Sequence, residues 1–323
     1  MTLLAIENLG IEIRRDRRVT RPVRGVSLSV GPAETVGVVG ETGCGKTLTG
    51  LSVLGLLPPG ARATGSIRLD GQELIALPDS GWRAISGGRV AMIFQNPGTA
   101  FDPVRTIGAQ FERVIRRHNR CTPRQAHGRA EELLTEVELT DTERVLRAYP
   151  HQLSGGMLQR AMIALALSCQ PRLIIADEAT SALDVTVAQQ VRRLLLRLQD
   201  EHGFGTLFIT HNLAEAYDVC DRVAVLYAGE VVESGPVERL FGSPAHPYTQ
   251  ALLQALPRPE NAGAPLTSLP GSVPANILDV TGCAFANRCP RAEALCHERR
   301  PSFVDVGAGH AAACHFAHSE VAA

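Results

Sequence analysis

Short apolar runs recur along the chain and predict β-strands. AIENLGIEI and VSLSV alternate apolar and polar side chains, as half-buried strands do. TVGVVG, VAMIF (residues 90–94), LIIAD (173–177) and TLFIT are apolar almost throughout, which is typical of strands buried on both faces. We also expect two hairpins, one turning at Asp70-Gly71 and the other near Gly229.

Residues 105–170 follow a different pattern, in which apolar positions recur at helical spacing, as in IGAQFERVIRRH and AEELLTEVEL. Because buried strands flank this segment, it predicts a helical subdomain, at about residues 96–168, inserted into an α/β fold. The strand–helix–strand order around VAQQVRRLLLRLQDEH predicts parallel strands with a right-handed crossover. From Ser243 onward proline and alanine dominate, and SPAHPYTQALLQALPRPENAGAP suggests a short helix followed by a linker. We therefore divide the chain into a domain at 1–242 and a C-terminal extension at 243–323.

The composition is that of an ordinary globular protein, with 323 residues, 45% of them hydrophobic and 20% charged, and a net charge of -1. No global basic field exists that would attract nucleic acid or an anionic membrane. No run is long and apolar enough to span a bilayer, and MTLLAIENLG does not resemble a signal peptide. We therefore expect any membrane role to act through a partner.

Lysine and cysteine are distributed unevenly. Of the 32 lysines and arginines only Lys46 is a lysine, which indicates that a compact ammonium does something there that a planar guanidinium cannot. Four cysteines are scattered, and four others crowd the C-terminal segment: Cys283, Cys289, Cys296 and Cys314. Without a secretion signal we do not expect disulfides, and the clustered cysteines suggest metal or iron–sulfur ligation.

The segment GETGCGKT fits the phosphate-binding pattern G-x-x-x-x-G-K-[ST], with an apolar strand before it and a helix after it. Backbone N–H groups of such a loop converge on phosphate oxygens at the start of the helix. We expect Lys46 to reach the β- and γ-phosphates of ATP, and the Thr47 hydroxyl to bind Mg²⁺. The strand–loop–helix context argues against an incidental glycine-rich turn. The candidate nucleotide-binding residues are Gly40, Glu41, Thr42, Gly43, Cys44, Gly45, Lys46 and Thr47.

Two acids close the buried strand LIIAD. An acid at the carboxyl end of a parallel strand lies where α/β folds bind ligands. We expect Asp177 to hold Mg²⁺ and Glu178 to polarise the attacking water. For an Asp-Glu pair by itself, the alternative is a charged strand end or a helix N-cap.

The motif LSGGM, followed by LQR, predicts a helix start in which Ser154 caps the helix. Gly155 and Gly156 let the backbone approach an anion closely. In a chain with a phosphate-binding loop, this motif resembles the signature loop of the ABC (ATP-binding cassette) proteins.

The other motifs of the ABC family occur in order. Gln95, after VAMIF, resembles the Q-loop glutamine, and His211, after TLFIT, resembles the switch histidine. SALD, ending at Asp184, resembles the D-loop. The resemblance implies a P-loop ABC nucleotide-binding domain with a RecA-like core, an antiparallel β subdomain, an inserted helical subdomain and a small cysteine-rich C-terminal extension.

The resemblance also implies a mechanism. Two subunits would form a head-to-tail dimer in which each ATP lies between one subunit's phosphate loop and the other's signature loop. Gln95 would contact Mg²⁺ and link the nucleotide to the helical subdomain, which docks on the membrane partner. The implied catalytic residues are Glu178, His211 and Gln95, and the further nucleotide-binding residues are Asp177, Ser154, Gly155, Gly156 and Asp184.

One feature of the family is missing. ABC proteins usually stack an aromatic side chain on adenine, but IRRDRRVTRPVR, residues 13–24, contains none. Arg14 or Arg15 could stack through its guanidinium plane instead. The alternative is that these arginines form a solvated turn.

Longer stretches resemble one branch of the family, the oligopeptide and dipeptide importer ATPases. They are ALDVTVAQQV, LSGGMLQRAMIALAL, HPYTQALLQALP and GCAFANRCPRAEALC, so the resemblance covers almost the whole chain. Nickel and other small-solute importers share similar signatures and remain an alternative. A soluble ABC ATPase is disfavoured because the chain lacks a long coiled-coil insertion and a second cassette, and a nucleotide-switched sensor is disfavoured by the complete catalytic set.

This resemblance also implies partners and a location. The partners would be a second, identical or homologous ATPase, two membrane permease subunits and an extracytoplasmic solute-binding protein, with no nucleic acid. The chain would lie peripherally on the cytoplasmic face of the cell (inner) membrane.

The clustered cysteines are spaced C-x5-C-x6-C-x17-C and lack the C-x2-C pairs common in zinc modules and bacterial ferredoxins. In the importer ATPases that the chain resembles, this segment binds a [4Fe-4S] cluster. Structural zinc and free thiols remain alternatives, and His310 and His315 are spare ligands if the metal is Zn²⁺.

Overall fold

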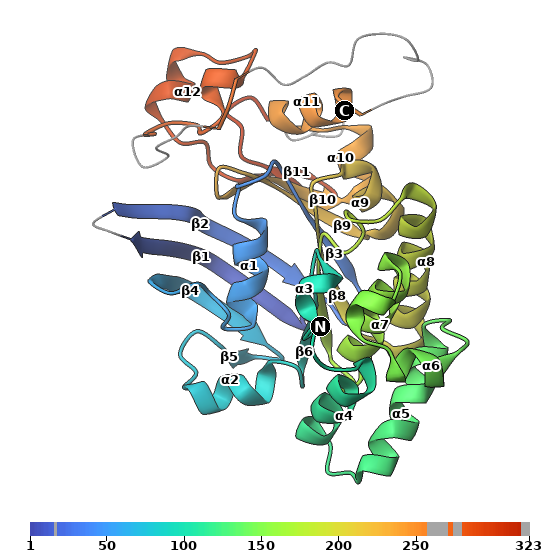
Figure 1. Cartoon of the computed structure of the whole chain (residues 1–323). Helices are drawn as coiled ribbons and strands as arrows, with labels where there is room; N and C mark the ends of the chain where they lie inside the picture. The colour runs from blue at the N-terminus through green and yellow to red at the C-terminus, as the bar shows by residue number, and fades with distance from the viewer. Residues whose placement is uncertain (16–17, 257–270, 274–279, 318–323) are drawn as a thin grey trace. The chain divides into compact units, whose positions relative to one another are not determined.

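The computed structural model describes residues 1–15, 18–256, 271–273 and 280–317 (Figure 1). The chain divides into two compact units, each discontinuous in sequence. The first, here called the signature unit, is formed by Met1–Leu3, Val30–Glu34 and Ala76–Ile209. The second, the phosphate-loop unit, is formed by Leu4–Ser29, Thr35–Ile75 and Thr210–Ala323.

Three parallel strands form the sheet of the signature unit: β6 (Val90–Ile93), β7 (Leu173–Asp177) and β8 (Gly205–Thr210). β7 is central, with Ile93 opposite Ala176 and Asp177 opposite Ile209. All residues of these strands are buried, as their continuous apolar sequences predict. Their carboxyl ends meet at one edge, so the residues that follow β6 and β7 come close together.

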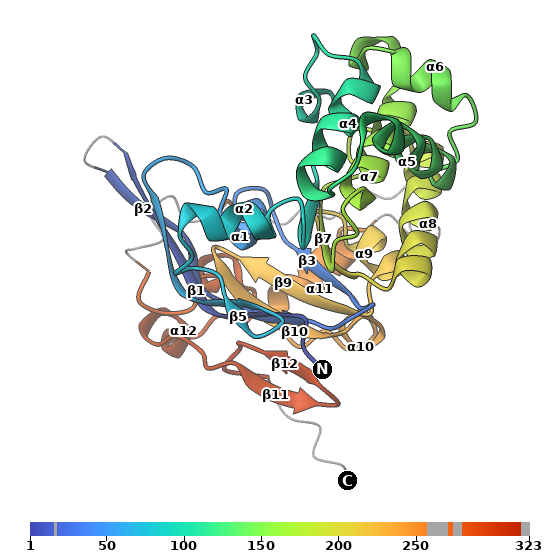
Figure 2. The same cartoon turned by 90° about the horizontal axis from the view of Figure 1, so that it is seen from below.

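Helices make up the rest of the signature unit. They are α2 (Asp79–Ile85), α3 (Pro97–Ala100), α4 (Ile107–His118), α5 (Pro123–Glu136), α6 (Thr142–Arg147), the 3₁₀ turn η1 (Pro150–Gln152), α7 (Gly155–Leu167) and α8 (Val185–His202). Figure 2 shows α4 to α7 gathered together, and in the chain they lie between β6 and β7. This is the inserted helical subdomain that the helical spacing predicted.

The phosphate-loop unit contains an antiparallel sheet in the order β2 (Arg18–Val30), β1 (Leu4–Arg15), β4 (Ala61–Leu69) and β5 (Gln72–Glu73). The hairpin between β4 and β5 turns at Asp70-Gly71, as predicted. Both residues have positive φ, 48° and 80°, which is what a type I′ turn requires.

A second set of strands in this unit begins with β3 (Thr35–Val39), which pairs in parallel with β9 (Arg222–Tyr227). β10 (Glu230–Pro236) forms the predicted hairpin with β9. The C-terminal segment then adds β12 (His310–Ala312) beside β10 and β11 (Val304–Gly307) beside β12 (Figure 2). The cysteine-rich segment is therefore attached to the unit as part of its sheet.

The helices of the phosphate-loop unit are short. They are α1 (Lys46–Val53), α9 (Leu213–Val219), α10 (Val237–Gly242), α11 (Pro247–Gln254), the 3₁₀ turn η4 (Ala286–Arg288) and α12 (Ala294–Glu298). α11 is the short helix expected after Ser243, whereas most of the linker expected after it lies outside the described residues. Within the described ranges of the chain, no helix is long and apolar enough to cross a membrane.

Candidate nucleotide site

The phosphate-binding loop connects β3 to α1 in the phosphate-loop unit. Gly45 is the N-cap of α1, with φ 102°, and no side chain caps the helix. A Cβ on Gly45 would lie 2.6 Å from the carbonyl oxygen of Pro22, so this position requires glycine. A helix start that no side chain caps favours an anion.

Lys46 is buried at the start of this helix, with 5% of its surface exposed. Its Nζ donates to the carbonyl oxygens of Gly40 at 2.8 Å and Glu41 at 3.1 Å. Buried charges need partners, and these carbonyls hold the ammonium beside the loop backbone. Burial also raises the pKa of the neighbouring Cys44 thiol, which keeps it neutral. The loop residues therefore fit a phosphate group.

The signature unit brings the predicted glutamine and glutamate together. Asp177 ends β7 and is buried, with 6% exposed, and Glu178 follows it with a left-handed backbone, φ 47°. The Glu178 N–H donates to the Ile209 carbonyl at 2.8 Å, which fixes the backbone. Gln95 Nε2 donates to Glu178 Oε2 at 3.0 Å. The side chain that would orient water is thus itself held by the predicted Q-loop residue.

The signature motif begins α7 as predicted. Ser154 is the N-cap, and its Oγ accepts from the N–H of Met157 at 3.3 Å. Ser154 and Gly155 are exposed, so the helix start presents backbone N–H groups at the surface of this unit. Asp184 caps α8 by accepting from the N–H of Val187 at 3.0 Å. A Cβ on Gly155 would lie 3.8 Å from Cδ2 of Leu183, so the signature loop and the D-loop are neighbours.

A residue to which the sequence gave no role, Gln159, connects the signature helix to the catalytic strand. Its side chain is buried, and its Nε2 donates to the carbonyl of Ala179 at 2.7 Å. Ala179 directly follows Glu178. The signature helix and the end of β7 therefore share a buried hydrogen bond, which makes independent movement of either one costly.

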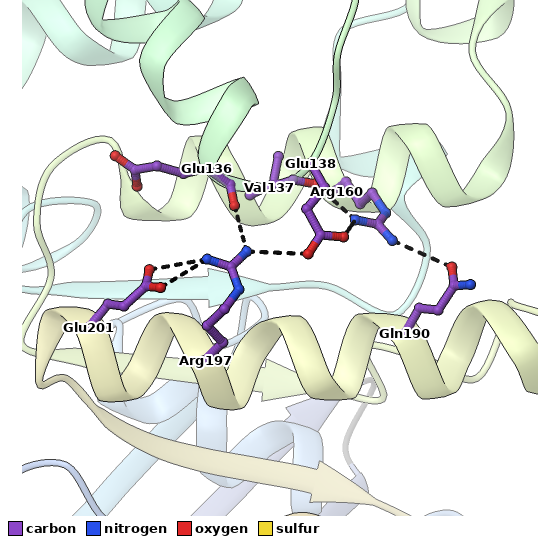
Figure 3. Close-up of polar contacts among 7 residues, drawn as sticks. All are labelled: Glu136, Val137, Glu138, Arg160, Gln190, Arg197 and Glu201. Atoms are coloured by element: carbon purple, nitrogen blue, oxygen red, sulfur yellow. Dashed lines mark hydrogen bonds and ion pairs between the residues drawn. The ribbon is translucent and has the colours of Figure 1, made fainter.

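Arg160, one position further along, anchors the signature helix to two other elements (Figure 3). Its Nη1 donates to the Val137 carbonyl at 2.9 Å and to Glu138 Oε2 at 2.6 Å. Glu138 also accepts from Arg197 of α8 at 3.4 Å. The hydrogen bond from Arg160 is the main cause that lowers the pKa of Glu138. This carboxylate thus bridges α7 and α8 beyond the end of α5.

His211 directly follows β8 and is exposed in the phosphate-loop unit. Its neighbours are fixed, because Asn212 caps α9 and Thr210 Oγ1 donates to Glu215 at 2.8 Å. The predicted residues are thus divided between the units. Lys46 and its loop share a unit with His211, whereas the carboxylates, Gln95, the signature loop and the D-loop belong to the other unit.

The surroundings of Arg14 and Arg15 neither confirm nor contradict the predicted contact with adenine. Arg14 is exposed, and its Nε donates to Glu12 Oε1 at 2.8 Å, while Arg15 is exposed as well. Residues 16–17 of the same stretch lie outside the described residues. Stacking by Arg14 or Arg15 stays a prediction.

None of the four C-terminal cysteines forms a disulfide. Burial raises the pKa of Cys283, and the charges of Cys296, Cys289 and Cys314 raise it further, while a backbone hydrogen bond opposes them. The Cys283 N–H donates to the Cys296 carbonyl at 2.7 Å.

Among the described residues, three or more potential metal-ligand atoms lie within 4.8 Å of one another in one group only, formed by His127, Glu131 and Glu143 of the helical subdomain. The four sulfurs therefore do not form a set as compact as the ligands of one ion.

Two family models match the chain. The model described as "ABC transporter" matches residues 23–181, and the model described as "Oligopeptide/dipeptide transporter, C-terminal region" matches residues 232–296. The second match spans α11, η4 and three of the four C-terminal cysteines.

Whole proteins and solved structures give the same picture. A Sinorhizobium fredii protein named "Probable peptide ABC transporter ATP-binding protein" is 44% identical over 315 residues, covering 97% of this chain and 94% of that protein. A Brucella abortus protein named as a peptide import ATP-binding protein is 43% identical, covering 97% and 96%. A solved ATP-binding cassette, described as a post-hydrolysis dimer bound to ADP and phosphate, matches with a TM-score of 0.65 and 26% identity. It covers 72% of this chain and 98% of that one.

Proposed function

The chain belongs to the ATP-binding proteins of the ABC transporter family, and from this we propose that it is the ATP-hydrolysing subunit of a peptide importer. The observation that carries the proposal is the unbroken series of motifs from the phosphate-binding loop to His211, each at the expected strand or helix end. The C-terminal match to oligopeptide and dipeptide transporters favours peptides over other solutes. Nickel or another small solute is the second candidate, because importers of that kind share similar signature motifs.

Each motif has a proposed task. The loop from Gly40 to Thr47 binds the phosphates of ATP through its backbone N–H groups, and Lys46 neutralises their charge. Asp177, Thr47 and Gln95 would hold Mg²⁺, which supplies charge neutralisation on the phosphate oxygens.

Two further side chains complete the proposed chemistry. Glu178 orients water and accepts its proton, and the hydrogen bond from Gln95 keeps the carboxylate in place. His211 stabilises the charge that develops on the transferred phosphoryl group.

We further propose that the signature loop serves the nucleotide of a second ATPase subunit. Ser154 and Gly155 are exposed on their own unit, and Asp184 lies in the neighbouring D-loop. The related cassette described as a dimer with ADP and phosphate supports such an assembly.

The partners and location follow from the same proposal. A second ATPase subunit, two permease subunits and an extracytoplasmic solute-binding protein would complete the importer at the cytoplasmic face of the inner membrane. The proposed domains are residues 1–242, with the helical subdomain at 96–168, and the extension at 243–323.

The ATPase proposal is tested by Glu178→Gln. The amide keeps the shape of the side chain and removes the carboxylate, so ATP binding should persist while hydrolysis is nearly abolished and ATP traps a dimer. Glu132→Gln, at an exposed carboxylate of α5, is the matched control and should hydrolyse ATP normally. Hydrolysis by Glu178→Gln within a few-fold of the unchanged protein would exclude the proposed role.

The transport proposal needs the membrane partners. We expect the chain to co-purify with a pair of membrane-spanning subunits, and ATP hydrolysis by the reconstituted complex to rise with a peptide-loaded binding protein. Stimulation by nickel and none by peptides would favour the second candidate. A chain that associates with no membrane subunit would contradict both.

We also propose that Cys283, Cys289, Cys296 and Cys314 hold a structural [4Fe-4S] cluster. In such a cluster each thiolate would bind a different iron, which needs sulfurs farther apart than the ligands of one zinc ion. Among the described residues the four sulfurs form no set as compact as those ligands, and this suits a cluster better than zinc. Protein purified without oxygen should be brown, with about four irons per chain. Colourless protein with one stoichiometric zinc would refute the cluster.

A further inference from the structure

An arginine of the cysteine-rich segment is bound to the phosphate-binding loop. Arg288 is followed directly by Cys289, and its side chain is buried, with 6% exposed. Its Nη1 and Nη2 donate to the two carboxylate oxygens of Glu41, both at 2.9 Å. Glu41 is the second residue of the loop and lies 247 positions earlier in the chain. Paired hydrogen bonds of this kind fix orientation as well as distance.

Aromatic side chains hold the guanidinium of Arg288 in place. Its Cζ lies 5.7 Å from the ring centroid of Tyr227 and 6.0 Å from that of Phe285. Nη1 also donates to the Tyr227 hydroxyl at 3.3 Å. Tyr227, Tyr248 and Phe285 pack together and are each at most 1% exposed, so the plane of Arg288 is set by a rigid group.

All the polar groups of Glu41 are engaged. Arg288 binds its carboxylate, and its N–H donates to the hydroxyl of Tyr248 at 3.0 Å. Its carbonyl oxygen accepts from Nζ of Lys46 at 3.1 Å. Residues of the C-terminal extension therefore bind both the side chain and the N–H of Glu41, and the carbonyl of the same residue contacts the ammonium of Lys46.

We propose that Arg288 and Tyr248 are positioning residues for the phosphate-binding loop, through which the C-terminal segment sets the affinity for ATP. The inference rests on the proposed function, because it takes the loop to bind ATP. Arg288 is buried and Glu41 is 29% exposed, so removing either partner leaves a charge with less solvent than it needs, and the loop must then move to solvate it. Removing both partners avoids that charge.

A competing explanation is that the contact between Arg288 and Glu41 only holds the cysteine-rich segment on the phosphate-loop unit. In that case its loss would lower the stability of the folded protein and leave nucleotide affinity unchanged. The two explanations therefore predict different dissociation constants for ATP in the variants. They also predict different changes in KM and kcat.

The test compares Arg288→Gln, Glu41→Gln and the double variant in the full chain. The dissociation constant for Mg-ATP is measured by calorimetry. Each single change should weaken binding about tenfold or more, corresponding to about 1.4 kcal/mol. The double variant should bind ATP at least as tightly as the single variant with the lower affinity, because the effects of two mutations at residues in contact do not add. KM for ATP should rise while kcat stays within about twofold, since Glu178 is untouched.

Arg291→Gln is the matched control. Arg291 lies in the same segment, beyond Cys289, but stacks on Phe316 at 5.6 Å, so its loss should leave ATP binding unchanged. Folded Arg288→Gln protein that binds ATP as tightly as the unchanged chain would overturn the proposal.

Should Arg288→Gln fail to fold, Tyr248→Phe removes only the hydroxyl that accepts the Glu41 N–H. It should weaken ATP binding several-fold, and unchanged binding would again overturn the proposal. An unchanged chain that does not bind ATP would instead refute the proposed function.

Discussion

His246 should make the protein sensitive to acid. Its side chain is buried, with 1% exposed, and caps α11, where Nδ1 accepts from the N–H of Tyr248 at 3.0 Å. Burial lowers its pKa from 6.5 to about 4, although the charge of the nearby Glu233 opposes the change. The folded state therefore holds His246 neutral at a pH where the unfolded chain has already protonated it.

The sign and size of the effect follow from linkage. Between pH 6.5 and 4 the unfolded state binds the proton and the folded state does not, so acid lowers the free energy of unfolding. The loss amounts to about 2 kcal/mol at pH 5 and about 3 kcal/mol at pH 4, at about 1.4 kcal/mol per pKa unit. Typical domains have about 5–15 kcal/mol in total, so the effect should be easy to measure.

The assay is urea denaturation of the unchanged chain and of His246→Asn from pH 7.5 to 5. The Oδ1 of asparagine can accept from the Tyr248 N–H but does not titrate, so the variant should lose less stability on acidification. Between pH 7.5 and pH 5, the free energy of unfolding of the unchanged chain should fall by about 2 kcal/mol more than that of His246→Asn. His127→Asn, at a half-exposed histidine, is the control, and its free energy of unfolding should depend on pH as that of the unchanged chain does. The same pH dependence in His246→Asn would refute the reasoning.

Four other substitutions test the site and the contacts that support it. Lys46→Arg should lose at least about tenfold in ATP affinity, measured by calorimetry, because a planar guanidinium does not fit where a buried ammonium contacts two loop carbonyls. Gly40→Ala should abolish ATP binding in the same assay, since its Cβ would lie 2.1 Å from the Leu226 carbonyl oxygen and displace the loop. Arg160→Met should destabilise the protein to urea by about 1–3 kcal/mol, because a buried carbonyl loses its donor. Glu138→Gln should cost under about 1 kcal/mol, since that carboxylate is more than half exposed.

Local sequence predicted those features that are decided locally. The turn at Asp70-Gly71 needs two positive φ angles, and that pair of residues provides them. The helical subdomain followed from apolar spacing. The solitary lysine, Lys46, is buried and its ammonium contacts two loop carbonyls, which is where the sequence predicted a role for it.

Contacts between distant residues could not be predicted in this way. Arg288 and Glu41 are each ordinary in their own segments, and nothing local marks them as a pair. β11 and β12 are short strands whose pairing depends on β10, far away in the sequence. Gln159 was visible within the signature motif, but its acceptor is a backbone carbonyl, which leaves no sequence signal.

The C-terminal segment has a second attachment besides Arg288. Glu233 of β10 is fully buried and accepts from the N–H groups of Ala245 and His246, and its Oε1 lies 2.7 Å from Nε2 of His310. The segment is thus tied to its unit near residue 288 and again at β12, independently of any metal. Loss of the proposed cluster should therefore loosen the residues between the two attachments, while the segment stays on the sheet. In Cys289→Ser, proteolytic cuts should fall between Arg288 and His310, and cuts elsewhere in the chain would argue that the cluster supports more than its own segment.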